Sequence, residues 1–423
     1  MTMKNFKLLL LVCISTFSSL SADEQYLIKG ATVHTLGTLG TIENADVLIV
    51  AGKIQLIGTD ISPAGTSTEI DGTGKHVTPG LLNPSTALGL VEIGAVKSTV
   101  DSTNTDKDYS ASLSIADVIN PNSSLWAHNR NNGLTHAMVV PSHSKELFSG
   151  QGSMIRLTND MQHIALRDNA IYMSYGDTGA ERSGGTRALA LQKIRAAFAD
   201  VQDLLNSPNK DKYEPKSHLK LRELKALLPV LTDSRPVVVN AHRANDILVM
   251  LDLAKKYSLT MVIKGAEEAW QVKDQIAAAK VALMLNPYNN LPSEFETIGN
   301  RIDQMTILHE AGIPLMISNN TSHNAYVIRQ IAGNAVAHGL PWEDALASIT
   351  KVPAQWFGLG SEFGTLETGM KANLVVWDGD PLETTTSAEQ VFIDGKSVSM
   401  SSRQTKLRDR YMSDDDNASG YRF

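Results

Sequence analysis

Three histidines and one lysine are the residues of this chain best suited to chemistry. His242 and His323 each come shortly after an apolar segment, Lys264 directly follows another, and His136 lies within a fourth. Imidazoles bind divalent metals and transfer protons near neutral pH. A lysine removed from water has a lowered pKa, and Schiff-base chemistry is then conceivable. One interpretation is a metal site built from the three histidines if they face one another. The alternative for each is an ordinary surface or hydrogen-bonded histidine.

The segments that must position these residues alternate between two patterns along the middle of the chain. Short apolar runs predict strands at 135–140, 236–240, 259–263, 281–285 and 313–318. Amphipathic runs predict helices at 125–132, 187–205, 219–228, 245–257, 273–279 and 298–311. Apolar strands between amphipathic helices are typical of a parallel sheet covered by helices, and their number fits an eight-stranded α/β barrel. The glycine-rich run Ser149–Ser153 predicts a tight turn between β-elements.

Both ends of the mature chain have a β-type pattern instead. Short alternating strands occupy residues 22–78, and strands separated by turns return at 361–400. We expect the two ends to fold together into one small β-domain, with the barrel at 79–360 inserted between its halves. The charged tail at 401–423 is expected to be partly disordered or to lie on the surface.

The first 21 residues have the pattern of a secretory signal peptide. Lys4 and Lys7 precede an apolar run that is too short for a comfortable membrane span, and small residues follow at 19–21. Removal of this segment takes away two lysines and no acid, so the formal charge of −7 becomes −9. The only cysteine, Cys13, lies inside it. We therefore expect a periplasmic or secreted protein without disulfides or thiolate ligands.

Three motifs together resemble one family of proteins. Pro79-Gly80-Leu81-Leu82 looks like the start of the first barrel strand of the amidohydrolase superfamily. The segment 364–381 resembles the closing motif of its imidazolonepropionase-like members, with Asn373 where aspartate is usual. Segments 332–337, 342–346 and 350–358 resemble the last barrel helices. The resemblance implies a TIM-like (β/α)8 barrel with a small β-sandwich domain formed by both chain ends, and its site at the C-terminal ends of the strands.

The same resemblance implies chemistry by a hydroxide bound to one or two divalent ions, with ligands from His-x-His on the first strand, histidines on the fifth and sixth, and aspartate on the eighth. Mapped onto this chain, the ligand positions carry Asn83, Ser85, Asn240, Lys264 and Asn319, with Asn320 as the alternative on the eighth strand. A second register of the first strand would use Ser85 and Ala87. Amides and a hydroxyl bind zinc poorly, and an ammonium opposes it. We therefore expect no metal.

Lys264 supports two interpretations. A dication with one aspartate carries a local charge near +1, as an ammonium does, so the lysine would replace the metal electrostatically and keep a pocket for an anion or a carbonyl. The alternative is a lysine paired with Glu267 or Glu268 and without a chemical role.

Two functions follow from these patterns. The first is an exported pseudoenzyme that has lost its metal centre and acts as a binding or partner subunit, with Lys264, His242 and His323 as binding candidates. It would bind a small molecule, form a homo-oligomer or pair with an intact paralogue. The second is an active hydrolase of cyclic amide or peptide-like C–N bonds that holds zinc with unusual ligands. The negative charge argues against nucleic acid, and no membrane contact is expected after signal removal.

Overall fold

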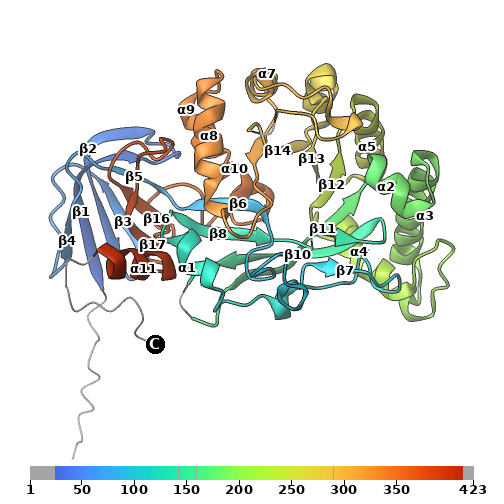
Figure 1. Ribbon diagram of the computed structural model, residues 1–423, viewed down its shortest axis with the longest axis horizontal. Coiled ribbons are helices and arrows are strands. Elements are labelled where there is room, and N and C mark those ends of the chain that lie inside the picture. The colour runs from blue at the N-terminus through green and yellow to red at the C-terminus, as the bar shows by residue number, and fades with distance from the viewer. Residues whose placement is uncertain (1–23, 142, 159, 289, 413–423) are drawn as a thin grey trace, which may run out of the picture.

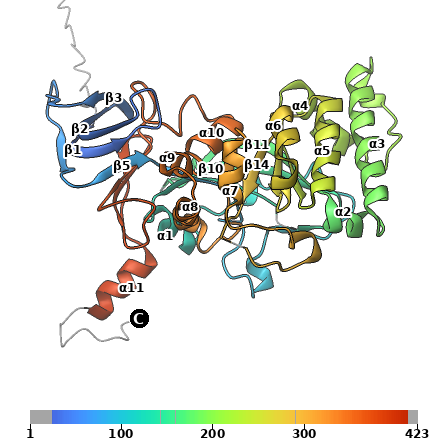
Figure 2. The same ribbon diagram turned by 90° about the horizontal axis from the view of Figure 1, so that it is seen from above.

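The computed structural model describes residues 24–141, 143–158, 160–288 and 290–412, and shows a barrel beside a smaller β-domain (Figures 1 and 2). The segment expected to be a signal peptide lies outside these ranges. Within the described residues, none of the helices is both long and apolar enough to cross a bilayer.

The barrel sheet has the strand order β15-β14-β13-β12-β11-β10-β8-β6. The bounds of its strands in chain order are β6 (Leu81–Thr86), β8 (Leu134–Val139), β10 (Phe148–Arg156), β11 (Ile164–Ser174), β12 (Val237–Ala241), β13 (Met261–Gly265), β14 (Ala282–Leu285) and β15 (Leu315–Ile317). Strands β11 to β15 pair in parallel, as do β6 and β8. The α/β barrel expected from the sequence is confirmed.

One strand departs from the regular β/α alternation. Strand β10 pairs antiparallel with both β8 and β11, and the described residues between β10 and β11 contain no helix. The run Ser149–Ser153 lies within β10, so the tight turn expected there is wrong. At Gly152 an added Cβ would lie 2.5 Å from the ring of Tyr172, so the glycine lets the neighbouring strand approach closely.

Helices cover the outside of the barrel, and most lie on one side of it in Figure 2. Their bounds are α1 (Ser124–Arg130), α2 (Gly176–Ser183), α3 (Arg187–Asn206), α4 (Leu221–Thr232), α5 (Ala244–Tyr257), α6 (Lys273–Ala279), α7 (Gln304–Glu310), α8 (Ile328–Ala337), α9 (Trp342–Ala347) and α10 (Lys351–Trp356). The longest, α3, begins at Thr186, whose side chain accepts a hydrogen bond from the Leu189 amide. Its buried residues Ile194, Phe198 and Val201 follow helical spacing.

Alternate residues of the strands face two separate cores. Val237 and Val239 pack against the helices, whereas Val238 between them faces the barrel interior. The interior also holds Met138, Met154, Tyr172, Met284 and Met316, and Phe357 and Phe363 from the segment after α10 close it at one end. This period of two is the reason each strand can be apolar on both faces.

The β-domain is one continuous sheet built from both chain ends, seen in Figure 1 as blue and red strands side by side. Its N-terminal part comprises β1 (Gln25–His34), β2 (Thr41–Val50), β3 (Lys53–Gly58), β4 (Thr68–Asp71) and β5 (His76–Pro79), and its C-terminal part β16 (Leu374–Trp377), β17 (Ala388–Ile393) and β18 (Lys396–Ser397). The halves join where β5 pairs antiparallel with β16. Beyond them, Arg403–Met412 form helix α11, so this part of the tail is ordered.

The junction between the two domains places a glycine against a tryptophan. Gly133 precedes β8 with φ of +89°, and an added Cβ would lie 2.3 Å from the Trp377 ring of β16. That ring is fully buried, and its Nε1 donates to Thr78 Oγ1 at 2.9 Å. The ring therefore has little freedom to move.

Gly133→Ala is expected to lower the free energy of unfolding by about 3 kcal/mol, because it combines a left-handed backbone with overpacking. Gly369→Ala is the matched control, since its φ of +92° is similar and nothing lies within 4 Å. The difference between the unfolding free energies of the two variants in urea isolates the cost of the steric contact with Trp377. Equal losses in the two variants would show that Trp377 gives way.

Candidate functional site at the barrel mouth

A row of inward-facing residues crosses the C-terminal ends of the central strands. Ser174 of β11 pairs in register with Asn240 of β12, and Asn240 pairs with Lys264 of β13. Lys264 in turn is level with Met284 of β14. Residues in register point to the same side of a sheet, so Asn240 and Lys264 share this end of the barrel, as predicted by the mapping of the fifth and sixth strands.

The side chain of Ser85 meets this row from the first strand. Lys264 Nζ donates to Ser85 Oγ at 2.8 Å and approaches Asn320 Oδ1 at 3.4 Å. Ser85 Oγ donates to the same Asn320 oxygen at 3.1 Å. One ammonium, one hydroxyl and one amide thus form a closed triangle where the family places its metal.

Burial lowers the pKa of Lys264 to about 8. No carboxylate lies within salt-bridge distance of its ammonium among the residues that the structure describes. The expected alternative of a pair with Glu267 or Glu268 is therefore wrong. Glu267 binds His242 Nδ1 instead, and Glu268 accepts from the Ala244 amide at 2.9 Å.

Asn83 has a different role from Ser85. Its Nδ2 donates to the carbonyls of Asn319 at 3.0 Å and Ala325 at 2.9 Å, and its Oδ1 accepts from the Ser85 amide at 3.0 Å. The fully buried amide thereby ties β6 to the segment after β15, where the barrel sheet lacks a strand ladder. Both amide hydrogens and one lone pair of Asn83 are used in these bonds, so this side chain is not available to a ligand at the mouth.

His242 forms a dyad with Glu267 beside Asn240. Its Nε2 lies 3.0 Å from Asn240 Nδ2 and 3.7 Å from Glu296 Oε1. Burial opposes a charge on this imidazole, but the hydrogen bond that Glu267 accepts from it and the charges of Glu267 and Glu296 outweigh burial and raise the pKa of His242. With Nδ1 held by a carboxylate, the ring has the orientation of a proton acceptor.

The other two histidines lie elsewhere. His136 is fully buried toward the opposite end of the barrel, its ring centroid 4.1 Å from that of Phe363, and burial lowers its pKa to about 3. His323 is exposed, in a loop near His128 and Glu92. The predicted three-histidine site is therefore wrong. Asn319 donates to the Asn324 carbonyl at 2.8 Å, and only Asn320 reaches Lys264.

A cavity of about 300 Å³ opens at this mouth. Its polar lining includes Asn240, Lys264 and Asn320, together with four residues that the sequence analysis did not select: Ser149, Ser174, Thr178 and Arg182. Arg182 of α2 donates to Ser174 Oγ at 2.8 Å and lies 3.4 Å from Ser149 Oγ. Burial lowers the pKa of this arginine, against a small opposing effect of Glu181. The only sequence signal was the position of Arg182 shortly after a strand end.

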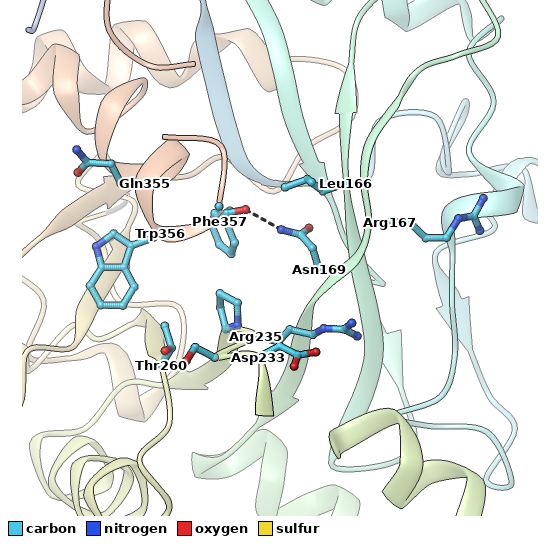
Figure 3. Close-up of a pocket in the computed structure, with 12 residues that line it drawn as sticks. Leu166, Arg167, Asn169, Asp233, Arg235, Thr260, Gln355, Trp356 and Phe357 are labelled. Carbon is cyan, nitrogen blue, oxygen red and sulfur yellow. Dashed lines mark hydrogen bonds between the residues drawn. The ribbon is translucent and has the colours of Figure 1, made fainter. Parts of the chain in front are cut away.

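A larger cavity of about 610 Å³ lies at the other end of the barrel, where β12 and β13 begin (Figure 3). Trp356 and Phe357 face Thr260, Asp233 and Arg235 across it, and Asn169 donates to the Phe357 carbonyl at 2.9 Å. Sites in β/α barrels lie at the C-terminal ends of the strands, and the opposite face serves stability. We therefore assign function to the smaller cavity.

Comparisons with known proteins agree with this architecture. The model of the amidohydrolase family matches residues 240–398. The crystal structure of an amidohydrolase from Thermotoga maritima MSB8 superposes with a TM-score of 0.79 at 26% identity, covering 88% of this chain and 99% of the other. The chain belongs to the amidohydrolase superfamily.

Curated relatives match over shorter stretches of this superfamily member. Amidohydrolase tasK of Hapsidospora irregularis is 39% identical over 90 residues, which is 21% of this chain and 9% of that protein. Imidazolonepropionase of Chromobacterium violaceum is 37% identical over 75 residues, 17% of this chain and 18% of that protein. The chain thus spans less than a fifth of either relative.

The groups at the mouth do not fit the divalent metal that the superfamily implies. Ser85, Asn240 and Asn320 offer neutral oxygens or amides, and Lys264 brings a positive charge to their centre. Within the described part of the chain, no group of three or more histidine, cysteine, aspartate or glutamate side chains is arranged to hold a metal ion. Zinc requires anionic or imidazole donors, and an ammonium repels it.

Lys264→Met is expected to be more stable than wild type by a larger margin at pH 7 than at pH 10.5. Because the folded-state pKa is depressed, the unfolded chain binds the extra proton between about pH 8 and 10.5, so wild-type stability rises across that window. The full gain is about 3 kcal/mol, at about 1.4 kcal/mol for each pH unit. The variant lacks this gain. Urea unfolding of both proteins from pH 7 to 10.5 measures it, and a constant difference would contradict the buried ammonium.

Asn83→Ala is expected to destabilise the fold by about 3 kcal/mol, because it leaves two buried carbonyls and one amide without partners. Asn319→Ala is the control, since Asn319 is half-buried and its side chain donates one bond. We expect that control to cost less than about 1 kcal/mol. Chemical denaturation of the two variants measures both losses in the free energy of unfolding. Equal losses would show that the side chain of Asn83 does not stabilise the seam.

Proposed function

We propose that this amidohydrolase-superfamily protein works without a catalytic metal and binds a small molecule at the barrel mouth. The observation that supports it is the position of the Lys264 ammonium, held by Ser85 and Asn320 with no carboxylate beside it among the described residues. This ammonium is half-buried, and a charge withdrawn from water without a counterion costs free energy. A ligand that supplies negative charge or a carbonyl oxygen would offset that cost.

Electrostatics explains how such a site can arise from a metal centre. A divalent ion with one aspartate and an ammonium both present a net charge near +1 to a ligand. Replacing the first by the second therefore keeps the attraction for an anion or a polarised carbonyl. It also removes the metal-bound hydroxide that attacks C–N bonds in the superfamily. The proposed protein therefore still recognises an anion or a carbonyl group but lacks the hydroxide nucleophile.

The proposal also includes export of the protein and its association with a partner subunit. A signal peptide at 1–21 would deliver the protein to the periplasm or the medium, where it would form a homo-oligomer or pair with an intact paralogue. N-terminal sequencing of protein recovered from the periplasm checks the first point, and light scattering with and without the paralogue checks the second.

The competing function is a hydrolase that holds zinc with unusual ligands. It needs three imidazole or carboxylate groups around one point. The His242–Glu267 dyad with Glu296 supplies the nearest set, but Glu267 is on Nδ1 and Glu296 is directed toward Nε2 at 3.7 Å. The two carboxylates therefore lie on different sides of the ring.

Elemental analysis of the mature protein, purified without chelator, distinguishes the two functions. We expect zinc, iron and manganese each below about 0.1 per chain, and no change in thermal stability with added zinc or with EDTA. The reason is that the cation at the mouth repels a second one. A stoichiometric metal together with chelator-sensitive hydrolysis of a cyclic amide would overturn the proposal.

A further inference from the structure

We propose that the mouth cavity binds a small dicarboxylate, with one carboxylate at Lys264 and the other at Arg182. This inference rests on the proposed binding function and names its ligand class.

Lys264 and Arg182 both line this one cavity. Arg182 is anchored on Ser174, Lys264 on Ser85, and Ser174 and Lys264 are in register across the intervening residue Asn240. Neighbouring strands lie about 4.8 Å apart, so the backbones at Ser174 and Lys264 are separated by about 10 Å. A single carboxylate would neutralise only one of these cations, whereas a short dicarboxylate can reach both.

Acidic side chains around the mouth bind other groups or face solvent. Glu267 binds His242, Glu296 binds Arg187 at 3.0 Å, and Glu181 points to solvent from the exposed face of α2. The ion pairs of the described residues include neither Lys264 nor Arg182. Their hydrogen-bond partners are hydroxyl and amide oxygens, which carry no formal negative charge. Planar guanidinium groups bind carboxylates through two parallel hydrogen bonds.

The remaining walls of the cavity suit the aliphatic chain that joins the two carboxylates of a diacid. Val140, Pro141, Met173 and Val238 give an apolar surface, and Asn240 lies between the two cations with a polar amide. About 300 Å³ is at the lower limit of small-molecule sites. The space therefore favours an aliphatic diacid of a few carbons over a nucleotide or a peptide.

The test is isothermal titration of the purified mature protein with succinate, glutarate and adipate at pH 7. Butyrate, succinamide and inorganic phosphate serve as the singly charged, uncharged and non-carboxylate probes. We expect at least one diacid to bind at least tenfold more tightly than butyrate, with no heat from succinamide. Affinity for that diacid should fall as the pH rises beyond 8, because burial lowers the pKa of Lys264 to about 8.

Variants assign the two carboxylates. Lys264→Met and Arg182→Gln should each weaken binding of the diacid at least tenfold, while their butyrate affinities change by different factors. Lys255→Met and Arg195→Gln, exposed on α5 and α3, are matched controls and should bind as wild type. Arg182→Lys keeps the charge and checks that any loss in Arg182→Gln is not a folding defect, which circular dichroism also monitors.

Three results would overturn the inference. They are no binding of any diacid at 10 mM, phosphate binding as tightly as the best diacid, or unchanged affinity in both cavity variants. If any of these results is obtained and the preparation contains no metal, the dicarboxylate inference is rejected but the proposed function is not. Stoichiometric metal in the same preparation would reject the proposed function itself.

Discussion

The ammonium of Lys264 is the charge around which the barrel mouth is arranged. It lies at the end of the sixth strand, where the resemblance predicts a metal ligand, and among the described residues its hydrogen-bond partners are a hydroxyl and an amide. Its hydrogen bonds cross the barrel from β13 to β6 and to the segment after β15. The same group therefore brings a positive charge to the mouth and links walls formed by different strands. Burial and the absence of a carboxylate partner in the described structure make that charge available to a ligand.

The shape of the mouth depends on the irregular half of the barrel. Because β10 runs antiparallel and follows β8 without a helix, Pro141 and Ser149 come to the rim of the cavity at the place where a regular unit would put a βα loop. Helix α2 then follows β11 closely and places Arg182 above Ser174. The opposite seam, between β15 and β6, is held by the amide of Asn83 and by backbone bonds to the carbonyls of Ser348 and Ile349. The strand reversal thus opens one side of the mouth, and hydrogen bonds close the seam on the other side.

The dyad of His242 and Glu267 adds a second polar group beside the position where the resemblance predicts a ligating histidine. Asn240 occupies the place of a ligating histidine, and its amide is directed to the imidazole two residues on. The raised pKa of His242 results from Glu267 and Glu296, which face it from the segments that follow β13 and β14. His242 contacts Asn240 of the row, but neither Glu267 nor Glu296 lines the cavity. They keep negative charge outside the cavity, which leaves the cavity itself cationic.

Sequence alone determined the fold class, the sharing of one β-domain between the chain ends, and the replacement of ligand-type residues along the fifth and sixth strands. These features are local or periodic: a period of two in strands, a period of 3.6 in helices, and motifs within a few residues. Only the tertiary structure decided which polar residues meet. Arg182 carries no motif, His136 is turned to the wrong end by its place in β8, and Asn83 is diverted into the seam. Such contacts depend on strand order, register and the reversal of β10. These bring together residues from different segments, some of them more than two hundred positions apart as for Asn83 and Asn319, and they leave no mark on the spacing within any one segment.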